Sequence, residues 1–271
     1  MTFFSCPICR AQLVPAERTW RCENGHSYDV ARSGYVNLLP PSGRDRHGDD
    51  RPMIAARRDF LQKGYYNHLA DAVCREALRY AHDGCVVLDA GCGEGYYTGR
   101  LERTLREKAG DCRVFGVDLS KNALALAART YPNVRFAAAS VNAIPLPDNS
   151  VDIVVDIFSP LADREYHRVL KPDGVLLYAI PLEQHLFSLK QAVYREPYPN
   201  RVQHREIAGF AAPERTDICR RIALPSTEDI LSLFTMTPYF HKTSPEDMKK
   251  LSTLSSLETD ADFALLCYRK L

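Results

Sequence analysis

The stretch VVLDAGCGEGYY, residues 86–97, decides the fold. An apolar run ends at Asp89, and Gly91, Gly93 and Gly95 follow it at once. A buried strand followed by a glycine-rich turn is typical of an open α/β sheet, in which the loop backbone closely approaches a ligand. The spacing Asp-x-Gly-x-Gly-x-Gly differs from the Gly-x-Gly-x-x-Gly pattern of dinucleotide-binding proteins. The stretch therefore predicts an α/β domain that binds a cofactor at this loop.

The chain beyond the loop alternates short apolar runs with amphipathic segments. Segment 120–131, SKNALALAARTY, has a helical period. The apolar runs are RVFGVDL, VRFAAAS, VDIVVDIFS and GVLLYAIP, followed by a last expected strand in ADFALLCYRKL. Near-continuous apolar strands separated by helices predict a mostly parallel, doubly wound sheet that is covered on both faces.

A second acidic residue makes the cofactor site more specific. Asp118 ends the next apolar run, 27 residues after Gly91, where a carboxylate can accept both ribose hydroxyls. The loop with its two acids resembles that of the class I S-adenosylmethionine-dependent methyltransferases, which have a Rossmann-like fold. The resemblance implies that the glycines admit the methionine part of the cofactor and that Asp89 receives its ammonium group. A nicotinamide or other nucleotide cofactor is the alternative, because it uses the same ribose carboxylate.

Segment 140–155, SVNAIPLPDNSVDIVV, extends this resemblance. Many methyltransferases have an aspartate near the position of Asn142, where it accepts the adenine amino group. Asn142 would accept that hydrogen bond through its amide carbonyl oxygen.

Segment 6–26, CPICRAQLVPAERTWRCENGH, predicts a metal site. Cys6 and Cys9 form one knuckle, and Cys22 and His26 form a second. Three cysteines and one histidine at this spacing are typical of a structural Zn²⁺ site that has no open coordination position. The alternative is a set of buried or disulfide-bonded cysteines. The absence of a visible signal peptide and the odd total of nine cysteines argue against it.

These features divide the 271 residues into three parts. We expect a zinc-binding module at 1–38, a charged linker without periodicity at 39–58 and a methyltransferase domain at 59–271. A long helix is expected to begin near Ala55 and to stop at Gly84.

The order of these parts resembles the bacterial 23S rRNA (guanine-N1)-methyltransferase family, whose relatives include macrolide-resistance enzymes. The resemblance covers nearly the whole chain. It implies zinc on the four ligands named above and a module that contributes to RNA recognition. It also implies a 23S rRNA hairpin loop as substrate and a homodimer. The cofactor contacts that it implies are Tyr66, Gly93, Glu94 and His185.

The residues that would touch RNA are less well marked. Guanine N1 must lose its proton, and Asp156 at the end of an apolar run is a candidate base, with Phe158 as a stacking ring. Cys92 and Cys219 lack the preceding proline that usually presents a nucleophilic cysteine. Candidate RNA contacts are Arg44, Arg46, Arg51, Arg57, Arg58, Tyr35 and Trp20.

Composition limits the remaining classes. The net charge of +1 neither requires nor excludes nucleic acid, and no apolar run approaches the roughly 20 residues of a membrane span. We therefore expect a soluble, cytoplasmic enzyme. Two alternatives stay open: a small-molecule or protein methyltransferase with a structural zinc module, and a non-catalytic RNA-binding factor in ribosome assembly.

Overall fold

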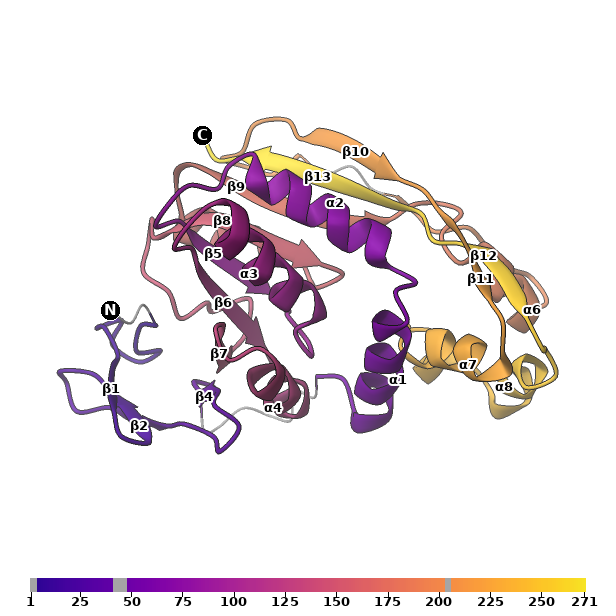
Figure 1. Ribbon diagram of the computed structural model, residues 1–271, viewed down its shortest axis with the longest axis horizontal. Coiled ribbons are helices and arrows are strands. Elements are labelled where there is room, and N and C mark those ends of the chain that lie inside the picture. Colours follow the sequence, from indigo (N-terminus) through magenta and orange to yellow (C-terminus); the bar gives the residue numbers. More distant parts are fainter. Residues whose placement is uncertain (1–3, 41–47, 203–205) are drawn as a thin grey trace.

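The computed structural model describes residues 4–40, 48–202 and 206–271, and a single large sheet lies at its centre (Figure 1). From one edge to the other, the strands are β10 (Glu214–Ile218), β13 (Phe263–Arg269), β9 (Leu170–Pro181), β8 (Val151–Ile157), β5 (Val86–Ala90), β6 (Arg113–Asp118), β7 (Arg135–Ala138) and β4 (Val36–Asn37). Only β13 runs antiparallel to its neighbours, β9 and β10, and every other adjacent pair is parallel. The predicted α/β fold with a mostly parallel sheet is confirmed.

The strand order reverses at the central strand β5. The chain goes from β5 to β6 and β7 on one side, and then crosses to β8 and β9 on the other. Ligands of open α/β sheets bind outside the carboxyl ends of the strands at such a reversal. The glycine loop at 91–95 lies at this place.

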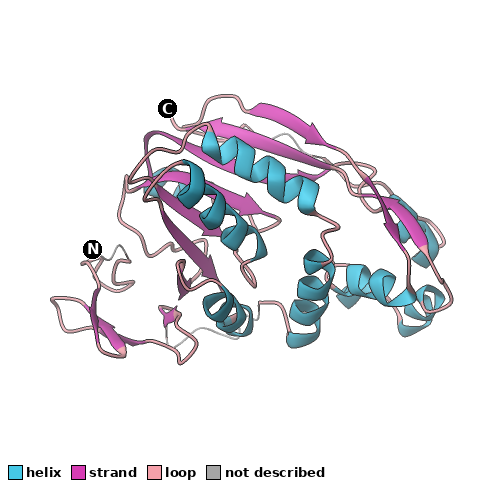
Figure 2. Ribbon diagram, viewed as in Figure 1, coloured by secondary structure: helices cyan, strands magenta, loops and turns pink. Residues whose placement is uncertain are grey.

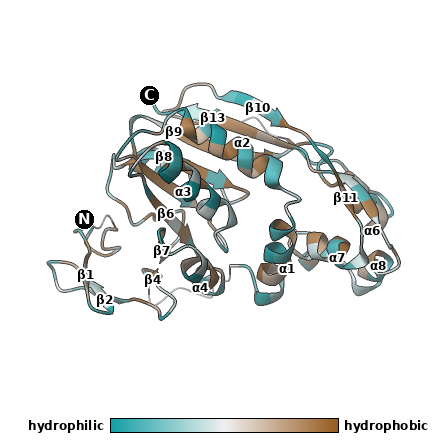
Figure 3. Cartoon of the chain, viewed as in Figure 1, coloured by the Kyte–Doolittle hydropathy of each residue, from teal (hydrophilic) through white to brown (hydrophobic). Residues whose placement is uncertain are grey.

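The two faces of the sheet are covered by different elements. Helices α2 (Asn67–Leu78), α3 (Tyr96–Lys108) and α4 (Lys121–Thr130) cover one face, and Figure 2 shows α2 and α3 lying across it. The short helix α5 (Asp163–Val169) and the amino-terminal module cover the other. All five residues of β5 are buried, as expected for a central strand with two covered faces. Figure 3 accordingly shows the inner strand β9 as mostly hydrophobic, whereas the exposed edge strand β10 is hydrophilic.

The amino-terminal module is part of this covering layer. Its strands β1 (Val14–Ala16), β2 (Thr19–Arg21) and β3 (Ser27–Asp29) form a small antiparallel sheet. Phe4 is fully buried and its ring lies 5.2 Å from that of Phe115 on β6. The Ser5 amide donates to the Pro145 carbonyl, and β4 pairs in parallel with β7. The module therefore shares a hydrophobic core with the large sheet.

The segment before α2 differs from the expected linker and long helix. Helix α1 (Arg51–Gln62) begins inside the range 39–58, and the chain breaks at Gly64 (φ +83°) before α2. The Asp50 side chain accepts from the Met53 amide, and Pro52 lies in the first turn. Both are helix-start signals, and they explain why this end of the segment is helical. Residues 41–47 of the predicted linker, which include Arg44 and Arg46, lie outside the described residues.

The remaining elements extend the sheet at one end. Strands β11 (Arg221–Leu224) and β12 (Leu257–Asp260) pair as an antiparallel ribbon beside the helices α6 (Phe187–Val193), α7 (Thr227–Thr235), η1 (Phe240–Lys242) and α8 (Pro245–Leu251). Helix α1 packs on α7, as Figure 1 shows. Within the part of the chain that the structure describes, no helix has the length and apolar character of a transmembrane segment.

Candidate functional site

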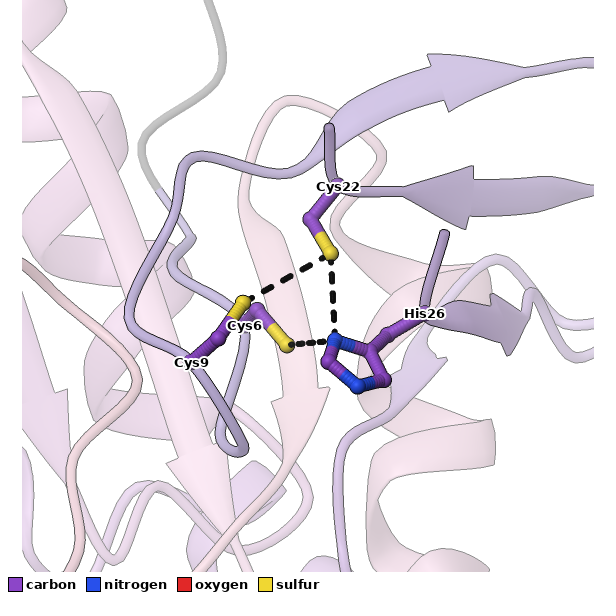
Figure 4. Close-up of side chains that lie close together, drawn as sticks. All are labelled: Cys6, Cys9, Cys22 and His26. Atoms are coloured by element: carbon purple, nitrogen blue, oxygen red, sulfur yellow. Dashed lines mark hydrogen bonds between the residues drawn. The ribbon is translucent and has the colours of Figure 1, made fainter. Parts of the chain in front are cut away.

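Four metal-binding side chains converge in the amino-terminal module (Figure 4). The sulfurs of Cys6, Cys9 and Cys22 and a ring nitrogen of His26 lie within 4.8 Å of one another. The Cys9 and Cys22 sulfurs are 3.7 Å apart, and His26 Nδ1 lies 3.3 Å from Cys22 Sγ and 3.5 Å from Cys6 Sγ. Zinc bonds of about 2.3 Å to sulfur and about 2.0 Å to nitrogen separate tetrahedral ligand atoms by roughly 3.5 to 3.8 Å. The four side chains fit a structural zinc ion.

Local backbone structure holds these ligands. The Cys22 amide donates to the His26 carbonyl, and the Gly25 amide donates to the Cys22 carbonyl. Gly25 adopts φ +82°, which this tight turn requires. The Tyr28 hydroxyl lies 3.0 Å from Cys6 Sγ and forms a hydrogen bond to this sulfur from outside the ligand set.

The glycine loop after β5 is held by backbone hydrogen bonds and close contacts. The Gly91 and Cys92 amides donate to the Val117 carbonyl, which fixes the loop against the end of β6. Gly91 adopts φ +84°, and a Cβ there would lie 2.4 Å from the Ser159 Cβ. A side chain at Gly91 would therefore collide with the turn that follows β8. The loop and that turn form one edge of the site.

Asp118 stabilises this loop through two hydrogen bonds to backbone amides. One carboxylate oxygen accepts from the Gly93 amide at 2.9 Å, and the other accepts from the Ser120 amide at 2.7 Å. Burial raises the pKa of Asp118, while these amide hydrogen bonds oppose that change. Its position at the carboxyl end of β6 is the one expected for a ribose carboxylate.

The Asp89 side chain lies below the glycine loop, whereas the sequence predicts that it faces the cofactor. Its side chain is buried beneath the loop and accepts from the Thr98 hydroxyl on α3. Burial raises the pKa of Asp89 to about 7. Asp89 thus joins the loop to the helix behind it. The direct contact of Asp89 with an ammonium group stays a prediction.

Tyr66 and His185 belong to one aromatic cluster. Their ring centroids are 6.1 Å apart, and Phe263 lies 5.0 Å from Tyr66 and 4.6 Å from His185. The cluster brings together the amino end of α2 and the turn after β9. Asn142 is exposed on the other side of the switch point, after β7.

The comparisons with known proteins agree with this geometry. Residues 4–44 match the family described as "RlmA, N-terminal", a zinc ribbon, and residues 87–174 match a methyltransferase domain. The 23S rRNA (guanine(748)-N(1))-methyltransferase of Streptomyces fradiae is 38% identical over 195 residues, covering 70% of this chain and 68% of that protein. The chain belongs to the 23S rRNA (guanine-N1)-methyltransferase family.

A second relative covers almost the whole length. YxjB of Bacillus subtilis, whose name assigns it provisionally to the 23S rRNA (guanine-N1)-methyltransferases, is 29% identical over 275 residues. The match covers 98% of this chain and 96% of that protein. The solved structure of the Bacillus subtilis YcgJ protein has a TM-score of 0.52 at 19% identity, over 76% of this chain and 99% of that one. That likeness shows the fold alone.

The family uses S-adenosylmethionine as methyl donor, and the structure fits that cofactor. Tyr97 Oη and His185 Nδ1 are both buried without a hydrogen-bond partner within the described residues. Burial lowers the pKa of His185 to about 3, so its ring is neutral and Nδ1 can accept a hydrogen bond. Glu94 is also buried, and the charge of Arg57 opposes the rise in its pKa. Buried polar atoms without a protein partner suit a polar ligand.

The structure places Arg57, a predicted RNA contact, beside the cofactor loop instead. Its guanidinium forms an ion pair with Asp49 and lies 3.6 Å from where a Cβ on Gly93 would stand. The charges of Asp49, Glu94 and Asp118 raise the pKa of Arg57. Arg57 therefore belongs to the cofactor loop of this methyltransferase. The sequence places it in a charged segment 36 residues before Gly93, and no local signal marks the contact.

Asp156, the candidate base, has no exposed surface, and its assignment as a base stays a prediction. Its carboxylate is fully buried and accepts from the Ser159 amide, the Ser159 hydroxyl and the Tyr166 hydroxyl at 2.8 to 3.1 Å. Burial raises the pKa of Asp156 to about 6. The carboxylate is enclosed by the turn at 156–159 and by Tyr166. Its role is to hold that turn.

Proposed function

We propose that this protein transfers the methyl group of S-adenosylmethionine to N1 of a guanine in an unpaired hairpin loop of 23S rRNA. Family membership supports the reaction, and relatives carry that reaction in their names. The single observation that carries the RNA part is Phe158. This ring is 46% exposed beside the glycine loop, at the carboxyl end of β8.

Phe158 is held in an unfavourable backbone conformation. Its φ is +63°, which costs a residue with a Cβ about 1–2 kcal/mol. The three hydrogen bonds to Asp156 hold the turn in this shape. Strain of this kind concentrates at functional sites. An exposed ring at the reaction edge suits the stacking of an unpaired base, which is how proteins recognise RNA loops.

Different residues hold the methyl donor and the acceptor base. S-adenosylmethionine supplies an electrophilic methyl group on a sulfonium. The backbone of the glycine loop and Asp118 orient the donor, and the Phe158 ring orients the base. Methyl transfer is an in-line displacement, in which the N1–C bond forms as the C–S bond of the sulfonium breaks and the N1 proton passes to water. Holding the two reactants close and aligned supplies much of the rate. Asp156 acts through the Phe158 turn as a positioning residue.

The test is methyl incorporation from labelled S-adenosylmethionine into unmodified 23S rRNA. A methyl group on N1 blocks Watson–Crick pairing, so reverse transcriptase stops at one loop position. Mass spectrometry of the digested RNA then identifies 1-methylguanosine. Label that survives ribonuclease would identify a protein or small-molecule acceptor and overturn the proposal. Absence of cofactor binding would favour the RNA-binding assembly factor.

Three further properties remain predictions. Light scattering in solution tests the homodimer, and the macrolide tolerance of a strain that expresses the gene tests resistance. A cytoplasmic location follows from a ribosomal RNA substrate, and fractionation of cells tests it.

A further inference from the structure

A cavity of about 590 Å³ lies beside the turn after β9, outside the cofactor loop. This volume falls within the roughly 300–1,000 Å³ of small-molecule pockets. It reaches the surface at Tyr198, whose exposed fraction is 65%. The residues that line it are Lys190, Tyr198, Pro199, Asn200, Arg201 and Tyr239.

Lys190 supplies a buried positive charge to this cavity. Its side chain on α6 is 2% exposed, and Nζ donates to the Tyr198 carbonyl at 3.1 Å and to Asn200 Oδ1 at 2.7 Å. Among the described residues, no carboxylate forms an ion pair with it. Burial lowers the pKa of Lys190. A buried cation without a counter-ion is costly, so an anionic ligand would be favoured here.

The walls of the cavity are aromatic. The Lys190 ammonium lies 5.0 Å from the Tyr198 ring centroid and 5.2 Å from that of Tyr239, within cation–π range. Arg201 is exposed at the rim, and none of the described residues that line the cavity is acidic. Aromatic faces beside positive charges are the combination that binds single-stranded nucleic acid, because bases stack and phosphates pair.

The cavity is joined to the proposed base platform. Asn200 Nδ2 donates to the carbonyls of Leu182 and His185 at 2.9 and 3.1 Å. The His185 ring contacts Phe263, and Phe263 lies 5.4 Å from Phe158. A row of rings therefore leads from Phe158 to His185, whose carbonyl accepts from Asn200 at the cavity.

We propose that the cavity is a subsite for a nucleotide that flanks the target guanine in the unpaired RNA. Its base stacks on the exposed ring of Tyr198, and its phosphate is bound by Lys190 and Arg201. This inference rests on the proposed function, because it names a second contact of the same substrate. It assigns a recognition role to residues that no part of methyl transfer requires.

Tyr198→Ala and Tyr198→Phe form the matched pair that tests stacking. Because Tyr198 is mostly exposed, neither change should unfold the protein. Tyr198→Ala should raise KM for unmodified 23S rRNA by about tenfold or more, while Tyr198→Phe stays within about twofold of the wild type. The Kd for S-adenosylhomocysteine should be unchanged in both. An unchanged KM for Tyr198→Ala would overturn the subsite and leave the proposed function standing.

Arg201→Ala tests the phosphate contact through salt dependence. Losing one single-strand phosphate contact should lower the slope of log Kd against log salt concentration for 23S rRNA by about 0.7. Arg221→Ala, on β11 and paired with Glu258, is the control and should leave the slope unchanged. An unchanged slope for Arg201→Ala would contradict the phosphate contact.

Photocrosslinking separates failure of the subsite from failure of the proposed function. The probe is a loop RNA with 5-iodouridine beside the target guanine, irradiated with the full-length protein. A crosslink to peptide 198–201 supports the subsite even if no methyl group is transferred. Absence of that crosslink with an actively methylated RNA overturns the subsite alone.

Discussion

The zinc module and the glycine loop each form a ligand site, but different groups hold the two sites in shape. Both are tight backbone turns that direct polar groups toward a small ligand. In the module, four side chains enclose the metal, and three strands of three residues each have little core of their own. In the loop, amide hydrogen bonds to Val117 and Asp118 fix the shape without any ligand. The difference teaches that zinc contributes to folding, whereas the cofactor binds a loop that is already formed.

Removal of a zinc ligand should give the largest effect. Cys22→Ser is expected to abolish zinc binding and to lower the free energy of unfolding by about 4 kcal/mol, because loss of a structural metal uncouples the buried Phe4 from the sheet. Metal analysis and urea denaturation measure both quantities. Cys219→Ser is the control, since Cys219 is exposed and outside the ligand set. If a zinc-free variant kept the wild-type free energy of unfolding, zinc would not contribute to folding and the module would not differ from the loop in this respect.

Asp118→Ala should affect the loop and leave the module intact. It removes two amide hydrogen bonds and the predicted ribose contact, so we expect the Kd for S-adenosylhomocysteine to rise about 100-fold, or about 2.7 kcal/mol. Zinc content should stay at one ion per chain. Asp111→Ala, at an exposed position, is the control. Loss of zinc in Asp118→Ala would show that the two regions fold as one unit.

The pH dependence of stability should report on Asp89. Its pKa is raised to about 7 in the folded state from an ordinary value of 3.8, so protons bind more tightly to the folded protein. The stabilisation is complete below about pH 4 and is lost as pH rises through 7. Relative to Asp89→Asn, the wild type should lose roughly 2.6 kcal/mol between pH 5 and pH 8. Urea denaturation of both proteins at each pH cancels the contribution of the zinc ligands, and parallel curves would contradict the prediction.

Tyr28→Phe should give the smallest effect. It removes the hydroxyl that contacts Cys6 Sγ and keeps the ring, so the zinc site retains its ligands. Loss of such an outer contact should weaken zinc affinity about tenfold, or about 1.4 kcal/mol. Competition with a chelator measures this, and Tyr198→Phe provides a tyrosine control outside the module. Equal affinity in both variants would mean that the first-sphere ligands alone fix the site.

Sequence could predict those parts of the molecule whose spacing is local. The four zinc ligands lie within 21 residues, and the loop with its acids lies within two strand–helix units. Contacts between residues far apart in the chain could not be predicted from local spacing. Arg57 reaches the loop only because α1 folds back on α7, although Asp50 and Pro52 already signal where that helix begins. The enclosure of Asp156 likewise depends on Tyr166 and on a turn whose direction no local pattern reveals.

The short pairing of β4 with β7 has a consequence for how the protein behaves in concentrated solution. Strand β7 would otherwise be the last strand of the sheet on its side, and an open edge is a template for another chain. Val36 and Asn37 occupy that edge, and the module holds them there. We therefore expect zinc also to limit self-association, because loss of the metal would loosen the module that covers this edge.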